Sequence, residues 1–137
     1  MGRLILVVDD EMHLRELVQA CLEDLAGWDT LAAASGEECL QILQSFTTSE
    51  QRFADSSVPV GAILLDVSMP GMDGFAVYEK LQENPATQTI PVILLTAKVL
   101  PSDRRKFEQM GVTGVISKPI EPMTLMNEVA EILGWDK

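Results

Sequence analysis

The stretch AILLDVSMPGMDG, residues 62–74, combines the local signals that decide the fold. Its first part, Ala62 to Leu65, is a continuous apolar run rich in isoleucine and leucine, typical of a strand buried on both faces of a parallel sheet. Asp66 follows the run directly, Pro70-Gly71 marks a turn, and a helical pattern begins at Gly74. The stretch therefore predicts a strand, a polar loop and a helix in succession.

The same succession recurs on both sides of this stretch. Further apolar runs predict strands at Leu4 to Val8 and Pro91 to Leu95, with weaker candidates at Thr30 to Ala34 and Gly114 to Ser117. Helical patterns cover Glu11 to Leu25, Gly36 to Phe46, Gly74 to Gln82, Ser102 to Met110 and Pro122 to Leu133. This alternation predicts an α/β fold, an open and mostly parallel sheet with helices on both faces and right-handed crossovers. Ligands then belong at the carboxyl ends of the strands.

Size and charge narrow the possible functions. With 137 residues, of which 47% are hydrophobic, the chain is expected to form a single domain, residues 1–137. Its 10 basic and 21 acidic residues give a formal charge of −11, which repels nucleic acids and anionic bilayers, so we expect no direct binding to either. No stretch is long enough to span a membrane, and the start Met1-Gly2-Arg3 does not resemble a signal peptide, which favours a cytoplasmic location. Cys21 and Cys39 lie in apolar helical patterns, where buried free thiols are expected.

Three carboxylates follow predicted strands at the same edge of the sheet. Asp9 and Asp10 come directly after the first strand, and Asp66 comes directly after the third. Close to one another, these anions require a proton or a hard divalent cation such as Mg²⁺. The alternative is local: Asp10 caps the first helix while Asp9 is exposed, and Asp66 only forms a turn.

Two further residues at strand ends add to this cluster. Thr96 follows the Pro91 to Leu95 run, and Lys118 follows the Gly114 to Ser117 run. A hydroxyl and an ammonium group beside a metal and carboxylates are suited to holding the oxygens of a phosphoryl group. For each residue taken alone a local role is favoured, a helix cap for Thr96 and an exposed turn position for Lys118, so the inference depends on their conjunction.

These motifs resemble the receiver domains of bacterial two-component signalling over essentially the whole chain. The matching segments are VVDDE at 7–11, LLDVSMPGMDG at 64–74, LLTA at 94–97 and SKP at 117–119. The resemblance implies five helices around a flavodoxin-like sheet with strand order 2-1-3-4-5. It also implies a response regulator that works as a switch and catalyses only its own phosphorylation and dephosphorylation.

Carried over to this chain, the resemblance assigns a role to each site residue. Asp66 would take a phosphoryl group from a histidine kinase or a phosphotransfer protein. Asp9, Asp10, Asp66 and the main-chain carbonyl of Ser68 would hold Mg²⁺, while Lys118 and Thr96 would contact the phosphoryl oxygens. The signal would pass to an unidentified protein through the surface of the fourth helix, fifth strand and fifth helix.

Three details of the loops around the site follow from the same resemblance. Small Ala97 would leave room for the phosphoryl group to enter. The bond between Lys118 and Pro119 would be cis. A side chain in place of Gly74 would crowd the loop after Asp66.

The chain departs from the family's pattern at two places. Val115 occupies the position of a usual aromatic residue, so the coupling of a hydroxyl group to a moving ring cannot operate in its usual form. The segment Thr47 to Pro59 is longer than a usual connection, and we expect an exposed loop that bulges away from the site and has room for one extra helical turn. It serves either as a tolerated insertion without a role of its own or as a partner-binding loop.

Other polar features have ordinary explanations. His13 is expected at a solvated position of the first helix rather than as a phosphotransfer histidine or a metal ligand. Arg104 to Lys106 are expected on a solvated helix face, with a contact to an acidic partner or to a second copy as the other possibility. Two other functions compete with the switch. An aspartate-nucleophile phosphatase typically needs a second acid-base aspartate, where this chain has Ser68, and a cap domain. A flavodoxin-like cofactor carrier is disfavoured by carboxylates where an anionic phosphate would lie.

Overall fold

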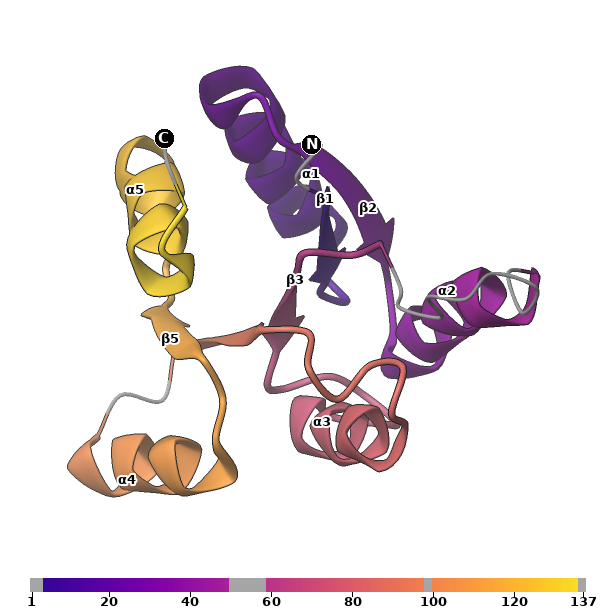
Figure 1. Ribbon diagram of the computed structural model, residues 1–137. Helices are drawn as coiled ribbons and strands as arrows, with labels where there is room; N and C mark the ends of the chain where they lie inside the picture. Colours follow the sequence, from indigo (N-terminus) through magenta and orange to yellow (C-terminus); the bar gives the residue numbers. More distant parts are fainter. Residues whose placement is uncertain (1–3, 50–58, 98–99, 136–137) are drawn as a thin grey trace.

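The computed structural model describes residues 4–49, 59–97 and 100–135. The strands of the described residues are β1 (Leu4–Val8), β2 (Asp29–Ala33), β3 (Ala62–Asp66), β4 (Val92–Thr96) and β5 (Gly114–Ser117). The helices are α1 (Met12–Ala20), the π-helical turn η1 (Cys21–Leu25), α2 (Gly36–Ser49), α3 (Gly74–Glu83), α4 (Pro101–Met110) and α5 (Pro122–Leu133). All strand pairs are parallel and the order is β2-β1-β3-β4-β5 (Figure 1). The expected fold class and strand order are confirmed.

Element boundaries differ from the predicted ones in a few places. β3 and β4 each end one residue later than predicted, at Asp66 and at Thr96. The first predicted helix, Glu11 to Leu25, continues without a gap but changes to π-helical hydrogen bonding at Cys21. α2 runs on to Ser49, so the predicted loop from Thr47 begins as helix, and residues 50–58 lie outside the described part of the chain.

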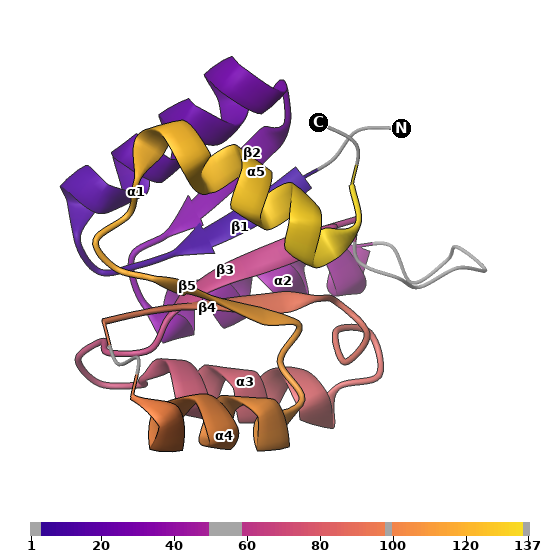
Figure 2. The ribbon, with the colours of Figure 1, turned by 90° about the vertical axis from the view of Figure 1, so that its left-hand side faces the viewer.

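The central strands alternate their side chains between two apolar layers, which explains why they appear as continuous apolar runs in the sequence. In β1, Leu6 and Val8 face the side covered by α2, α3 and α4, whereas Ile5 and Val7 face α1, η1 and α5. Figure 2 shows these two layers of helices on opposite sides of the sheet. Full burial of both strand faces is the pattern expected of a doubly wound parallel sheet.

Several expectations for individual residues are also met. Cys21 and Cys39 are buried and free, and burial raises the pKa of the Cys39 thiol to about 12. His13 and the run Arg104 to Lys106 are exposed. Within the described residues, no helix combines the length and the apolar character that crossing a bilayer requires.

Candidate functional site

The strand order brings the carboxyl ends of β1, β3, β4 and β5 to one edge of the sheet. Asp66 ends β3, Asp9 directly follows β1, and Val8 is in register with Leu65, so the two aspartates lie side by side. Asp10 completes a group of three carboxylates whose ligand oxygens all lie within 4.8 Å of one another. Figure 2 shows the loops that leave these strands gathered at the left-hand edge of the sheet. The expected clustering of the three aspartates is confirmed.

Lys118 connects the two buried carboxylates of this cluster. Its Nζ lies 3.1 Å from Asp9 Oδ2 and 3.0 Å from Asp66 Oδ1, although it follows β5, two strands away from β3. The backbone N–H of Lys118 donates to the carbonyl of Thr96 at 2.8 Å, and the bond to Pro119 is cis, as expected. The alternative of a solvated turn lysine is therefore wrong, because only 25% of the side chain is exposed and the ammonium is paired twice.

Burial and charge oppose each other at Asp66. Burial raises the pKa of Asp66, and the negative charge of Asp9 adds to this, while the hydrogen bond from Lys118 lowers it without cancelling the increase. For Lys118, burial alone lowers the pKa, but the hydrogen bond to Asp66 and the charges of both aspartates outweigh it and leave that pKa raised. Lys118 is therefore a stable cation, yet a single ammonium does not neutralise three carboxylates.

The residues present fit a hard divalent cation. The three aspartates offer carboxylate oxygens at mutual distances suited to one ion. Asp9 and Asp66 are buried while Asp10 is exposed, so the group is fixed on one side and open to solvent on the other. A cation at this place would also remove the electrostatic cost of ionising Asp66.

The structure corrects the local alternatives for three residues, Asp9, Asp10 and Thr96. Asp10 is not the cap of the first helix: Glu11 is, and its carboxylate accepts from the N–H groups of His13 and Leu14. Asp9 is buried rather than exposed, and its Oδ1 accepts from the N–H of Glu11 at 2.9 Å. Thr96 caps no helix either, because it is the buried last residue of β4 and α4 begins at Pro101.

The loop after Asp66 is packed tightly against the start of α3. The N–H of Ser68 donates to Asp66 Oδ1 at 3.3 Å. At Gly74, a Cβ would come within 2.5 Å of the Asp66 carbonyl oxygen and 2.9 Å of Val67 Cα, both backbone atoms. The expected requirement for glycine is confirmed. Ala97, next to Thr96, is exposed beside this edge.

Arg15 belongs to the site but was not expected there. Its guanidinium Nη1 donates to the main-chain carbonyl of Asp9 at 2.8 Å, so α1 holds the backbone that carries two of the three carboxylates. The signal available in the sequence was an arginine in a helix that starts directly after paired aspartates. Helix periodicity does not show that such a side chain reaches back to the preceding loop.

Val115 is half-buried on β5 and packs against the hydrophobic core between the sheet and helices α2, α3 and α4. Val115 pairs with Leu94 of β4, and Leu94 precedes Thr96 by two residues on that strand. The structure thus has an aliphatic side chain with few rotamers at this position.

Comparison with known proteins identifies the family to which the chain belongs. Residues 5–130 match the family model described as Response regulator receiver domain. Response regulator Rre1 of Synechocystis sp. is 33% identical over 94% of this chain and 51% of its own length. The phosphate regulon transcriptional regulatory protein PhoB of Pseudomonas aeruginosa is 30% identical over 96% of this chain and 52% of its own length.

Solved structures agree with these sequence matches. The chemotaxis response regulator CheY4 of Vibrio cholerae superposes with a TM-score of 0.81 at 27% identity, covering 96% of this chain and 99% of that one. A putative response regulator from Chloroflexus aurantiacus superposes with a TM-score of 0.80 at 30% identity, covering 98% of this chain and 99% of that one. The chain spans about half the length of Rre1 and PhoB. The match over residues 5–130, together with the shared fold, shows that this chain belongs to the response regulator receiver domain family.

Proposed function

We propose that this chain is a phosphorylation switch in which Asp66 accepts a phosphoryl group from a phosphohistidine on a sensor kinase or a phosphotransfer protein. The observation that supports this best is the contact of Lys118 with both Asp66 and Asp9 inside a three-carboxylate cluster. A nucleophilic carboxylate, a fixed cation and oxygen ligands for a metal are the components that phosphoryl transfer needs. Membership of the receiver family is consistent with this role.

In the proposed reaction, a carboxylate oxygen of Asp66 forms a bond to phosphorus while the bond from phosphorus to the histidine nitrogen breaks. Lys118, already at 3.0 Å from Asp66, pairs with the phosphoryl oxygens and balances their charge. Thr96, at the end of the neighbouring strand, contributes its hydroxyl to the same oxygens. Ala97 is small and leaves the entrance open.

Magnesium is the proposed cofactor because hard oxygen ligands dominate this edge of the sheet. Asp9, Asp10, Asp66 and the main-chain carbonyl of Ser68 would hold it, and it would neutralise charge on the transferred group. Arg15 supports the ligands by holding the carbonyl of Asp9. Burial of Asp9 and Asp66 keeps water away from one side of the site.

The proposed output is binding to another protein, through the surface formed by α4, β5 and α5. Because Val115 has no ring to move, we propose that the signal passes through the connection between Thr96 and α4 instead. We place the reaction in the cytosol, where the two free cysteines stay reduced.

Intact-mass measurement after incubation with Mg²⁺ and acetyl phosphate tests the proposed chemistry. We expect a gain of one phosphoryl group that requires the metal and is absent in Asp66→Ala. Asp24→Asn, a change at an exposed aspartate of η1, is the matched control and should behave as the unaltered protein. A gain that persists in Asp66→Ala, or no gain from acetyl phosphate or from a phosphorylated histidine kinase, would contradict the proposal.

A further inference from the structure

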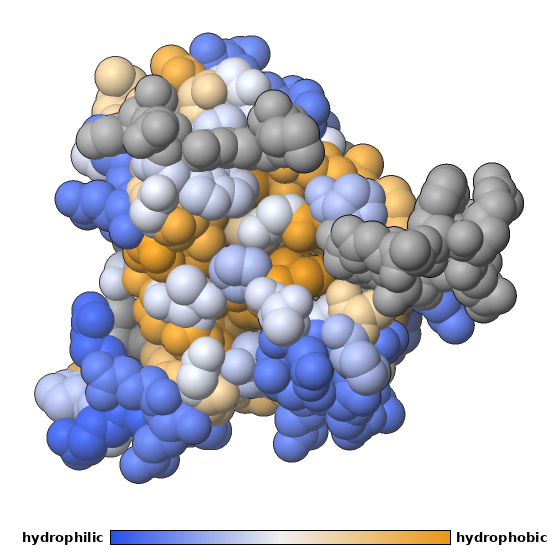
Figure 3. Space-filling model, viewed as in Figure 1, coloured by the Kyte–Doolittle hydropathy of each residue, from blue (hydrophilic) through white to orange (hydrophobic). Residues whose placement is uncertain are grey.

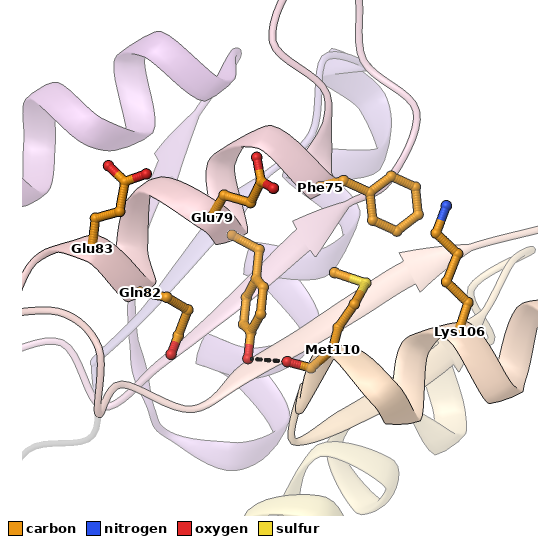
Figure 4. Close-up of a pocket in the computed structure, with 7 residues that line it drawn as sticks. Phe75, Glu79, Gln82, Glu83, Lys106 and Met110 are labelled. Atoms are coloured by element: carbon orange, nitrogen blue, oxygen red, sulfur yellow. Dashed lines mark hydrogen bonds between the residues drawn. The ribbon is translucent and has the colours of Figure 1, made fainter.

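A groove of about 620 Å³ lies between α3 and α4, separate from the carboxylate cluster. Its lining residues are Phe75, Tyr78, Glu79, Gln82, Glu83, Lys106 and Met110 (Figure 4). None of them takes part in the contacts described for the phosphoacceptor site. On the face shown in Figure 3, the surface over α3 and α4 is mostly hydrophilic. The lining of the groove differs from it because it includes the apolar side chains of Phe75 and Met110.

The floor of the groove is apolar and held in place. Phe75 stacks on the buried ring of Phe107, with centroids 6.0 Å apart and an interplanar angle of 24°. The hydroxyl of Tyr78 donates to the carbonyl of Met110 at 3.0 Å, which ties α3 to the last turn of α4. Phe75 and Met110 remain half-exposed, so an apolar side chain entering the groove would cover them.

The two walls of the groove carry opposite charges. Along α3, Glu79 and Glu83 are exposed, and a carboxylate oxygen of Glu83 lies 4.0 Å from the ammonium of the exposed Lys80. Across from them, the Lys106 ammonium of α4 lies 4.3 Å from the centroid of the Phe75 ring. Figure 4 shows Lys106 and Phe75 facing each other, with both glutamates on the α3 side.

We propose that the groove between α3 and α4 binds a basic amphipathic helix of another protein. The apolar face of that helix would cover Phe75 and Met110, and its lysine or arginine residues would pair with Glu79 and Glu83. Helix-in-groove recognition places anchors at intervals of three and four residues, which suits a cleft bordered by two helices. The formal charge of −11 disfavours a second copy of this chain or an anionic membrane as the occupant, and it favours a cationic partner.

Binding of synthetic helices, followed by fluorescence anisotropy, tests this proposal. The probe is a labelled helix of leucine, alanine and lysine with all leucines on one face, and its counterpart carries glutamate for every lysine. Saturating Mg²⁺ is present throughout, so that the carboxylates around Asp66 do not compete for the probe. We expect the basic helix to bind, and the acidic helix to bind at least tenfold more weakly.

Charge-reversed variants locate the binding. Glu79→Lys combined with Glu83→Lys should weaken binding of the basic helix at least tenfold, and Gln82→Trp, which fills the groove, should weaken it at unchanged charge. Glu16→Lys combined with Glu131→Lys is the matched control, because it makes the same charge change at exposed positions of α1 and α5. Equal loss in both double variants, undiminished binding to Gln82→Trp, or no binding of the basic helix would overturn the proposal. None of these results depends on phosphoryl transfer.

Discussion

Replacing Lys118 by methionine tests the charge balance of the site most directly. The change keeps the aliphatic stem but removes the cation that lies 3.1 Å from Asp9 and 3.0 Å from Asp66. Removing one partner of a buried ion pair typically costs 3–5 kcal/mol. Because a quarter of the Lys118 side chain is exposed, we expect a smaller loss of about 2–3 kcal/mol in the free energy of unfolding without metal.

The loss should depend on pH in a defined direction. The pKa of Asp66 is higher in the folded protein than in the unfolded chain. Between these two pKa values the folded protein holds a proton that the unfolded chain releases, so the free energy of unfolding falls as pH rises through this interval. Without Lys118, the hydrogen bond that lowers the pKa of Asp66 is lost, so this pKa rises further in the folded protein and the stability is lost over a wider pH range. Lys118 itself is charged throughout, since its own pKa is raised. The penalty should therefore be larger at about pH 8 than at about pH 5.

Urea unfolding followed by tryptophan fluorescence, which comes from buried Trp28 and from Trp135 packed against it, measures this penalty. Saturating Mg²⁺ should reduce it, because the ion supplies the missing positive charge. Lys106→Met, at an exposed position on α4, is the control and should cost far less at either pH. A loss in Lys118→Met that is the same at both pH values and insensitive to Mg²⁺ would refute the electrostatic account and leave only packing.

Three further changes have outcomes that follow from the same geometry. Asp66→Asn removes a buried ionisable group with a raised pKa, so it should increase the metal-free free energy of unfolding at neutral pH, measured in urea. Gly74→Ala places a Cβ against backbone atoms of Asp66 and Val67 and should cost about 1–3 kcal/mol in the same assay, with slower phosphorylation. Arg15→Met should weaken Mg²⁺ binding by about 10- to 100-fold in calorimetry while Arg15→Lys retains most of it, and unchanged affinity would remove Arg15 from the site.

The strands were predictable because burial on both faces leaves continuous apolar runs. Leu4 to Val8 and Ala62 to Leu65 alternate between two separate apolar layers, so neither run contains a polar position. In a parallel sheet the carboxyl ends of the strands share one edge, which predicts that Asp9, Asp66 and Lys118 all lie along it. The order of the strands came from the family resemblance, since periodicity does not order them.

Side-chain direction and helix type were not predictable in the same way. Glu11, rather than Asp10, caps α1, although both are common near helix starts. Cys21 and Leu22 lie in a π-helical turn, but their apolar character fits an α-helix equally well. The spacing of apolar residues indicates which face of a helix is buried, and it does not indicate which residues the backbone hydrogen bonds connect. The contact of Arg15 with Asp9 depends on a rotamer, which a sequence does not specify.

The groove and the proposed phosphoacceptor site are connected through both walls. α3 begins at Gly74, whose N–H donates to the carbonyl of Val67, next to Asp66. α4 follows Thr96, and its one fully buried side chain among the described residues is Phe107. A change at Asp66 that moves either connection would alter the spacing of the two helices. By linkage, phosphorylation would then change the affinity for the helix by the same factor as helix binding changes the phosphorylation equilibrium. The affinity of the basic helix, measured with and without acetyl phosphate, therefore determines this coupling, and equal affinities would show that the two surfaces act independently.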